Sequence, residues 1–275
     1  MSAADRVGTV AVGRQLLRTS VRPGTLPGPP LLICNGLGTA LETYQPFVDA
    51  LDPLLEVIRF DVPGVGGSSM PRLPYSFPLL AGIVGRMLDR LGYDRFDVLG
   101  FSWGGALAQQ LAFQNPRRCR RQVLVATTTG SIMVPGSLRL LLHMTALRQH
   151  RDTSRAHRVF GRIYGGRLRS RPELAKLLGL DHDRPGSQQS YCYQLAAAAG
   201  WTSLPFLPLI HQHSLILAGN DDPLVPLINA RIMARLLPSA RLHVYPDGHL
   251  WLLTGAEELA PVVARFLLAS TDAPK

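Results

Sequence analysis

Residues Asp97–Gln110 read DVLGFSWGGALAQQ, and they determine the architecture we expect. The stretch begins as a short apolar strand, Asp97–Phe101, and continues as the helical pattern Trp103–Asn115. At the junction stands a G-x-S-x-G pattern centred on Ser102. A sharp turn from strand to helix exposes the serine hydroxyl, and the flanking glycines allow the strand and helix to pack closely. The stretch therefore predicts a reactive serine beside the N–H groups and positive dipole of a helix N-terminus.

Short apolar runs alternate with helical patterns along the rest of the chain. This alternation is typical of an α/β fold with a mostly parallel sheet flanked by helices. The expected strands are Thr9–Val12, Gln15–Thr19, Leu31–Cys34, Glu56–Phe60, Asp97–Phe101, Gln122–Thr127, Ser214–Ala218 and Arg241–Tyr245. The expected helices are Tyr44–Leu51, Phe77–Leu91, Trp103–Asn115, Leu227–Leu236 and Glu257–Leu268.

One long interval, residues 131–212, contains no strand candidate, although it separates two strands that should be neighbours. A crossover of this length is more typical of an inserted helical domain than of a loop. Within it, Ser187–Ala199 reads as a helix that stops at Gly200. We therefore expect a core made of residues 1–130 and 213–275, and a helical cap made of residues 131–212.

Composition limits the class of protein further. The chain has 275 residues, of which 46% are hydrophobic and 17% charged, which favours one large folded core over disorder. No apolar run reaches the roughly 18 residues of a membrane-spanning helix, and Met1–Arg22 lacks the apolar region of a secretory signal. Cys34, Cys119 and Cys192 lack metal-ligand spacing, which favours reduced thiols in a cytoplasmic protein.

The formal net charge of +10 comes almost entirely from arginine. Only two of the 29 basic residues are lysines, and nine arginines between Arg139 and Arg171 are opposed only by Asp152. A basic chain can bind nucleic acid, but no zinc-finger, RNA-recognition or basic-zipper pattern accompanies this charge. We therefore expect no nucleic-acid partner, with a solvated arginine-rich face as the plainer interpretation.

A serine hydroxyl becomes a nucleophile only when a base accepts its proton. In strand-turn-helix hydrolases the order along the chain is serine, acid, histidine, which places the base near the C-terminus. We assign His249, in the loop after the last expected strand, as the general base. Asp221 and Asp222 follow the preceding strand, and either could orient the imidazole. Asp247 is expected to shape the histidine loop.

Acyl transfer also needs N–H donors aimed at the oxygen that becomes negative. The backbone N–H of Trp103, directly after the serine, is one candidate. The loop Asn35–Gly38 should supply the other, and we assign it to the N–H of Leu37. The glycine-rich loop Asp61–Ser69 is not expected to bind phosphate, because it lacks the Gly-Lys-Ser/Thr ending of a phosphate loop.

These motifs together resemble the α/β-hydrolase superfamily. More narrowly, a series of stretches resembles the intracellular depolymerases of medium-chain-length poly(3-hydroxyalkanoate), the polyester of bacterial storage granules. The stretches are Asp61–Ser69, Gly100–Gln110, Met133–Gly136, Ile163–Gly166, Gly200–Ser203 and Asp222–Asn229. The family's triad positions correspond to Ser102, Asp222 and His249, and its pattern G-x-x-D-x-x-x-P selects Asp222 over Asp221.

The resemblance implies a serine hydrolase that cleaves the polyester to 3-hydroxyalkanoic acids or oligomers, without a metal or organic cofactor. Its partners would be the granule surface or a medium-chain ester, together with granule-associated proteins, in the cytoplasm. The cap residues expected to contact the acyl chain are Leu140, Leu141, Met144, Trp201 and Phe206, with packing of cap onto core as the alternative for each. The rival functions are a general carboxylesterase or lipase and a non-catalytic binding protein of the same fold.

Overall fold

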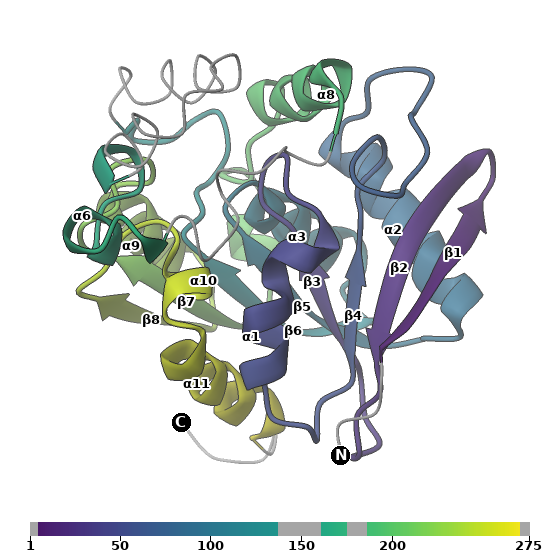
Figure 1. Cartoon of the computed structure of the whole chain (residues 1–275), viewed down its shortest axis with the longest axis horizontal. Helices are drawn as coiled ribbons and strands as arrows, with labels where there is room; N and C mark the ends of the chain where they lie inside the picture. Colours follow the sequence, from purple (N-terminus) through teal and green to yellow (C-terminus); the bar gives the residue numbers. More distant parts are fainter. Residues whose placement is uncertain (1–4, 137–160, 175–185, 270–275) are drawn as a thin grey trace.

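The chain is described by a computed structural model over residues 5–136, 161–174 and 186–269. These residues form an eight-stranded sheet in the order β1-β2-β4-β3-β5-β6-β7-β8 (Figure 1). β1 and β2 form an antiparallel hairpin at one edge, and the strands from β3 to β8 are parallel. The bounds are β1 (Arg6–Val12), β2 (Gln15–Arg22), β3 (Leu31–Cys34), β4 (Val57–Phe60), β5 (Phe96–Phe101), β6 (Cys119–Val125), β7 (His213–Gly219) and β8 (Ala240–Tyr245).

Helices cover both faces of the sheet (Figure 1). One buried cluster joins the sheet to α1, α10 and α11, and the other joins it to α2, α3 and α9. The helical bounds are α1 (Gln45–Ala50), α2 (Phe77–Leu91), α3 (Trp103–Gln114), α6 (Arg167–Ser170), α8 (Gln188–Ala199), α9 (Leu227–Leu236), α10 (Trp251–Thr254) and α11 (Ala256–Leu268), with short 3₁₀ turns η1 (Leu41–Tyr44) and η2 (Leu207–Leu209).

The central strands are apolar on both sides because both sides are buried. In β3, Leu31 and Ile33 belong to the cluster of α1 and α11, whereas Leu32 and Cys34 belong to the cluster of α2 and α3. Successive residues of a strand point to opposite faces of the sheet. When helices cover both faces, both sets of side chains are buried, and the strand loses the alternation of apolar and polar residues. This explains why the central strands read as continuous apolar runs in the sequence.

Two serines begin helices by capping their first free N–H groups. Ser76 Oγ accepts a hydrogen bond from the N–H of Leu79 at the start of α2, at 3.4 Å. Ser187 Oγ accepts one from the N–H of Ser190 at the start of α8, at 3.1 Å. A serine in this position satisfies a donor that the helix itself leaves unpaired. The helix expected over Ser187–Ala199 is confirmed as α8, with Ser187 as its N-cap.

The α/β architecture expected from the sequence is confirmed, with shifts at the ends of strands. β6 ends at Val125 rather than at Thr127, because Ala126 takes a positive φ of 47° and turns the chain away. The described parts of residues 131–212 contribute α6, α8 and η2 and no strand of the sheet. The division into core and cap stays a prediction. Leu140, Leu141 and Met144 lie outside the described residues. Among the helices that the structure describes, none has the length and apolar character to cross a membrane.

Candidate active site

Ser102 lies at the sharp turn between β5 and α3, with φ of 53° and ψ of −118°. A non-glycine residue in this region is strained and persists only where its surroundings hold it. Here the Ser102 N–H donates to Val125 O at 2.9 Å, and its carbonyl oxygen accepts from Thr127 Oγ1 at 2.7 Å. β6 and the residue two positions beyond its end therefore hold the turn from both sides.

Glycines allow the backbones to approach at this turn. A Cβ at Gly100 on β5 would overlap the carbonyl oxygen of Gly104 in the first turn of α3, and a Cβ at Gly104 would overlap the carbonyl oxygen of Cys34 on β3. Only residues without a side chain fit positions where one backbone lies directly on another. The two glycines thus allow the first turn of α3 to pack directly against the ends of β3 and β5.

Three side chains from the ends of three strands meet beside this turn. His249 Nε2 lies 2.9 Å from Ser102 Oγ, and His249 Nδ1 lies 2.7 Å from Asp222 Oδ2. The His249 and Asp222 side chains are only 5% and 1% exposed. When Nδ1 carries the proton and donates it to the carboxylate, Nε2 presents its lone pair to the hydroxyl. This is the arrangement that lets an imidazole accept a serine proton.

Asp222 and Asp221 point to different partners. Asp222 Oδ1 accepts hydrogen bonds from the N–H groups of Leu224 and Val225, both at 2.9 Å, which fixes the carboxylate toward His249. Asp221 instead pairs with Arg169, with Nε–Oδ2 at 2.9 Å and Nη2–Oδ1 at 3.0 Å. The hydrogen bonds from Arg169 lower the pKa of Asp221. The structure therefore brings Asp222, and not Asp221, into contact with the imidazole.

The histidine loop is held by a segment of the expected cap. The N–H of His249 donates to Tyr164 O at 2.7 Å. Asp247 Oδ1 accepts from the N–H of Arg167 at 3.0 Å, and its Oδ2 pairs with Arg167 Nε at 2.5 Å. Asp247 thus shapes the loop, as expected. The roles of Arg167 and Arg169 were missed, because their carboxylate partners lie far away in the sequence.

The two expected oxyanion donors belong to two different segments of the chain. Leu37 follows β3, and Trp103 is the first residue of α3. Within the described residues, neither backbone N–H makes a hydrogen bond, so both remain available to a ligand. Gly36, directly before Leu37, is held by Tyr44, whose Oη accepts a hydrogen bond from the N–H of Gly36 at 2.6 Å. Burial raises the pKa of Tyr44 to about 12, so this hydroxyl stays neutral at physiological pH.

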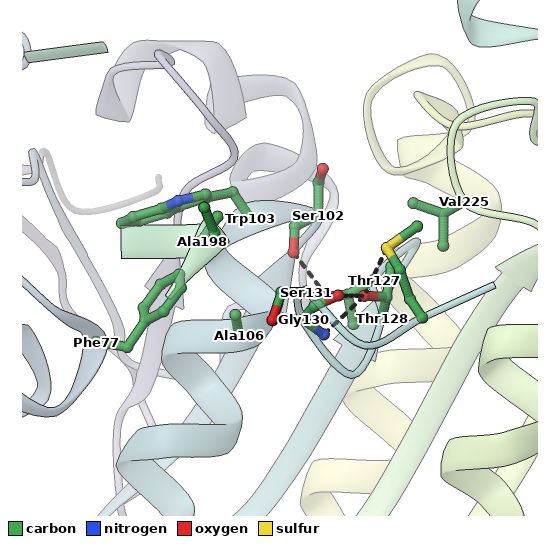
Figure 2. Close-up of a pocket in the computed structure, with 12 residues that line it drawn as sticks. Phe77, Ser102, Trp103, Ala106, Thr127, Thr128, Gly130, Ser131, Ala198 and Val225 are labelled. Carbon is green, nitrogen blue, oxygen red and sulfur yellow. Dashed lines mark hydrogen bonds between the residues drawn. The ribbon is translucent and has the colours of Figure 1, made fainter. Parts of the chain in front are cut away.

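An apolar pocket of about 290 Å³ opens beside Ser102. Figure 2 shows Phe77, Trp103 and Ala198 on one side of the serine and Thr127, Thr128 and Val225 on the other. The full lining is Phe77, Ser102, Trp103, Ala106, Thr127, Thr128, Gly130, Ser131, Met133, Ala198, Ala199 and Val225. Its mostly apolar walls suit an acyl chain attached to the serine.

Trp201 and Phe206 are not among the residues that line this pocket, and their contact with substrate stays a prediction, with packing as the alternative. Trp201 is buried, packs against Phe77 in a tilted arrangement with ring centroids 5.0 Å apart, and donates from Nε1 to Gln110 Oε1 at 2.6 Å. Phe206 stacks on Phe113 at 4.4 Å. Both side chains pack one part of the molecule onto another, because their large apolar surfaces are buried best against other rings.

The glycine-rich loop after β4 folds around its own aspartate. Asp61 Oδ1 accepts from the N–H of Leu41 at 2.8 Å, and Oδ2 accepts from the N–H of Gly67 at 2.9 Å. The amide of Gly67 is thus directed at a carboxylate, and the other bonded amides of the loop, those of Gly64, Val65, Ser68 and Ser69, donate to backbone carbonyl oxygens. Among the described residues, no three His, Cys, Asp or Glu side chains are grouped to hold a metal ion.

Comparison with known proteins agrees with this geometry. Residues 29–256 match the alpha/beta hydrolase fold family. The chain is 51% identical to a poly(3-hydroxyalkanoate) depolymerase of Ectopseudomonas oleovorans, over 94% of this chain and 91% of that protein. It is 28% identical to a 2-hydroxymuconate semialdehyde hydrolase of Pseudomonas putida, over 95% and 96% of the two chains.

Solved structures show the same fold. A hydrolase from Pseudomonas aeruginosa PA01 superposes with a TM-score of 0.79 at 25% identity, covering 96% of this chain and 98% of that one. An enol-lactonase from Burkholderia xenovorans LB400 has the same TM-score at 23% identity, covering 95% and 100%. The resemblance drawn from the motifs is confirmed, and the chain belongs to the alpha/beta hydrolase fold family.

Proposed function

We propose that this chain hydrolyses the ester bonds of medium-chain-length poly(3-hydroxyalkanoate), releasing 3-hydroxyalkanoic acids or oligomers. The observation that carries the proposal is the hydrogen-bonded series from Ser102 through His249 to Asp222, placed beside an apolar pocket. The 51% identity to a poly(3-hydroxyalkanoate) depolymerase supports the substrate class. Ester hydrolysis needs no chemistry beyond what these side chains and two backbone N–H groups supply.

The first half of the proposed reaction forms an acyl-enzyme. His249 Nε2 accepts the proton of Ser102 as Oγ attacks the ester carbonyl carbon. The carbonyl oxygen becomes negative and is stabilised by the N–H groups of Leu37 and Trp103. The tetrahedral intermediate then collapses as His249 gives its proton to the departing alcohol oxygen. The acyl chain of the 3-hydroxyalkanoyl unit occupies the pocket between Phe77 and Val225.

The second half releases the product. A water molecule takes the place of the alcohol, His249 accepts one of its protons, and the hydroxide oxygen attacks the acyl carbon. The same N–H groups stabilise the second oxyanion, and the proton returns from His249 to Ser102 Oγ as the acid leaves. The carboxylate of Asp222 stabilises the imidazolium that forms twice in each cycle.

The proposal extends to the place of action, the cytoplasmic surface of polyester granules and their associated proteins. The arginine-rich stretch Arg139–Arg171 supports adsorption to a surface that carries anionic groups. Arg167 and Arg169 are engaged by carboxylates of the core, so adsorption rests on the other arginines of the stretch. Binding to isolated granules should weaken as salt rises, and affinity indifferent to ionic strength would count against this part of the proposal.

The catalytic part of the proposal is tested with an alkyl phosphonate and with two substrates. The phosphonate should label the wild-type protein and leave Ser102→Ala unlabelled, and a failure to label the wild type would indicate a binding protein. The wild type should degrade a latex of medium-chain polyester as well as a soluble octanoate ester. Turnover of the soluble ester alone would indicate a general carboxylesterase.

A further inference from the structure

The N–H of Leu37 belongs to the peptide that joins Gly36 to Leu37, and this peptide is anchored at its other end. Gly36 O accepts hydrogen bonds from the N–H of Thr39 at 3.3 Å and from Thr39 Oγ1 at 2.9 Å. In a planar trans peptide the C=O and N–H bonds point in opposite directions. Anchoring the oxygen therefore aims the N–H of Leu37 away from Thr39.

The next peptide is anchored from a different part of the chain. The N–H of Gly38 donates to Gln194 Oε1 at 3.0 Å. Gln194 lies on α8 and is only 1% exposed. Gly38 has a positive φ of 67°, and a Cβ there would lie 3.3 Å from the ring of Tyr191 on the same helix. The loop that carries the proposed oxyanion donor thus lies directly against α8, in the expected cap.

Gln194 also contacts the residue that carries the second proposed donor. Its backbone carbonyl oxygen accepts a hydrogen bond from Trp103 Nε1 at 2.8 Å. Trp103 and Ala198, one turn further along α8, both line the pocket. One buried residue of α8 is therefore bonded to both segments from which oxyanion donors are expected (Figure 1 shows α8 over this end of the sheet).

We propose that Gln194 is a positioning residue for catalysis, whose side-chain oxygen holds the Leu37–Gly38 peptide so that the N–H of Leu37 faces the reacting carbonyl. The inference rests on the proposed function, because it presupposes acyl transfer at Ser102. Without the acceptor, the buried N–H of Gly38 would lose its partner, and the loop would rotate to satisfy it. The donor at Leu37 would then be displaced, although the chemical groups of the site remained present.

The test uses two substitutions at one position and a matched control on the same helix. Gln194→Met keeps the side-chain volume and removes the amide oxygen, whereas Gln194→Glu keeps an acceptor oxygen. Gln189→Met makes the first change at an exposed position whose amide bonds to Tyr193 Oη. For each protein one measures kcat and KM on a soluble octanoate ester. The affinities for an alkyl trifluoromethyl ketone and for octanoate are measured as well.

The ketone forms a tetrahedral adduct with Ser102 and reports on the oxyanion donors, whereas octanoate reports on the pocket. Complete loss of an oxyanion donor costs about 100–1000-fold in rate, and we expect its displacement in Gln194→Met to cost about 10–100-fold. The same factor should appear in kcat and in ketone affinity, with KM and octanoate affinity unchanged. Gln194→Glu should recover most of the loss, and Gln189→Met should match the wild type.

Three results would overturn the inference. They are wild-type kcat in Gln194→Met, an equal loss in Gln194→Glu, and a parallel fall in ketone and octanoate affinity. If Gln194→Met fails to fold, Gln194→Asn replaces it, since its amide is one methylene too short to reach Gly38. Failure of the proposed function looks different, because the wild-type protein itself would then neither turn over esters nor react with the phosphonate.

Discussion

The orientation of one imidazole governs what this site can do. His249 is buried between the rings of Phe101 and Tyr164, with centroids 5.4 and 6.2 Å away. Its Nδ1 faces the Asp222 carboxylate, which accepts a hydrogen bond, and its Nε2 faces the Ser102 hydroxyl, which donates one. Asp222 therefore acts on the tautomer and on the charge of the ring, rather than on the substrate.

The two neighbouring aspartates should differ sharply when each is changed to asparagine. Asp222→Asn replaces an acceptor with a group that can donate, which favours the wrong tautomer and leaves the imidazolium unstabilised. We expect its kcat to fall by about 10³–10⁴-fold. Asp221→Asn, which alters a side chain paired with Arg169, should stay within a few-fold of the wild type. Comparable losses of kcat in the two folded variants would contradict the assignment of Asp222.

Helix α6 is too short to be stable alone, and its contacts with the core explain why it forms. The hydrogen bonds of a single turn do not offset the conformational entropy that is lost when the first turn of a helix forms. The N–H of Gly166, just before the helix, donates to Asp221 Oδ2 at 2.7 Å. Arg167 pairs with Asp247 and Glu258, and Arg169 pairs with Asp221. The helix is thus attached to the loops that carry Asp222 and His249.

The pair between Arg169 and Asp221 should give a stability difference that depends on pH. The pKa of Asp221 is lowered in the folded state, so the pair stabilises the protein above the usual aspartate range. This contribution is lost as pH falls through the lowered pKa. Arg169→Ala should therefore reduce the unfolding free energy at neutral pH by about 0.2–1 kcal/mol, the size of an exposed pair.

The difference in unfolding free energy between the wild type and Arg169→Ala should vanish in acid. Urea unfolding of both proteins at a series of pH values measures it. Arg162→Ala removes the same charge from the same segment and serves as the control. A difference between Arg169→Ala and wild type that stays constant from neutral to strongly acidic pH would show that Asp221 is not the partner that matters.

A buried arginine joins the sheet to the C-terminal end of α11. Arg121 on β6 donates from Nη1 to Leu267 O at 2.7 Å and from Nη2 to Ala269 O at 2.6 Å. The last carbonyl groups of a helix have no partner within the helix and carry its negative dipole. The guanidinium of Arg121 donates hydrogen bonds to these carbonyl groups and places a positive charge at the negative end of the helix. Its central carbon also lies 5.6 Å from the ring centre of Phe266.

Removing this guanidinium should weaken the folded state without changing the chemistry. Arg121→Met keeps much of the apolar stem and leaves the carbonyl oxygens of Phe266 and Ala269 without their charged donor, while Leu267 O keeps its hydrogen bond from Arg120 Nη2 at 2.9 Å. We expect the free energy of unfolding to fall by about 2–3 kcal/mol, with kcat per folded molecule unchanged. Arg117→Met is the matched control, because Arg117 lies at an exposed position in the connection between α3 and β6. A loss of equal size in both variants would refute the role of Arg121.

Local patterns were enough to predict the fold and the positions of Ser102 and His249, and they limited the acid to Asp221 or Asp222. Each of the three follows a strand, and parallel strands bring their carboxyl ends to one edge of the sheet. Between Asp221 and Asp222, the resemblance to a known family selected the residue that the structure places against the imidazole. Leu140, Leu141 and Met144 lie outside the described residues, so their role stays a prediction.

The pocket and its supports were not predictable from local patterns. Ala106 and Ala198 line the pocket because they are small, and small residues leave no signal in a sequence. Gln194 meets Gly38 across 156 positions of chain, a contact that only the assembled fold creates. The contact of Trp201 with substrate stays a prediction, because apolarity alone does not distinguish a ring that packs from a ring that binds.

The attachment of α8 to the loop after β3 has a consequence for protein engineering. Chimeras that graft a foreign lid in place of the expected cap would exchange Gln194 along with the pocket-lining positions Ala198 and Ala199. Specificity and turnover would then change together, even when the donor lid was chosen only for its substrate. Transplanting residues 35–39 with the lid would keep each loop with the helix that matches it.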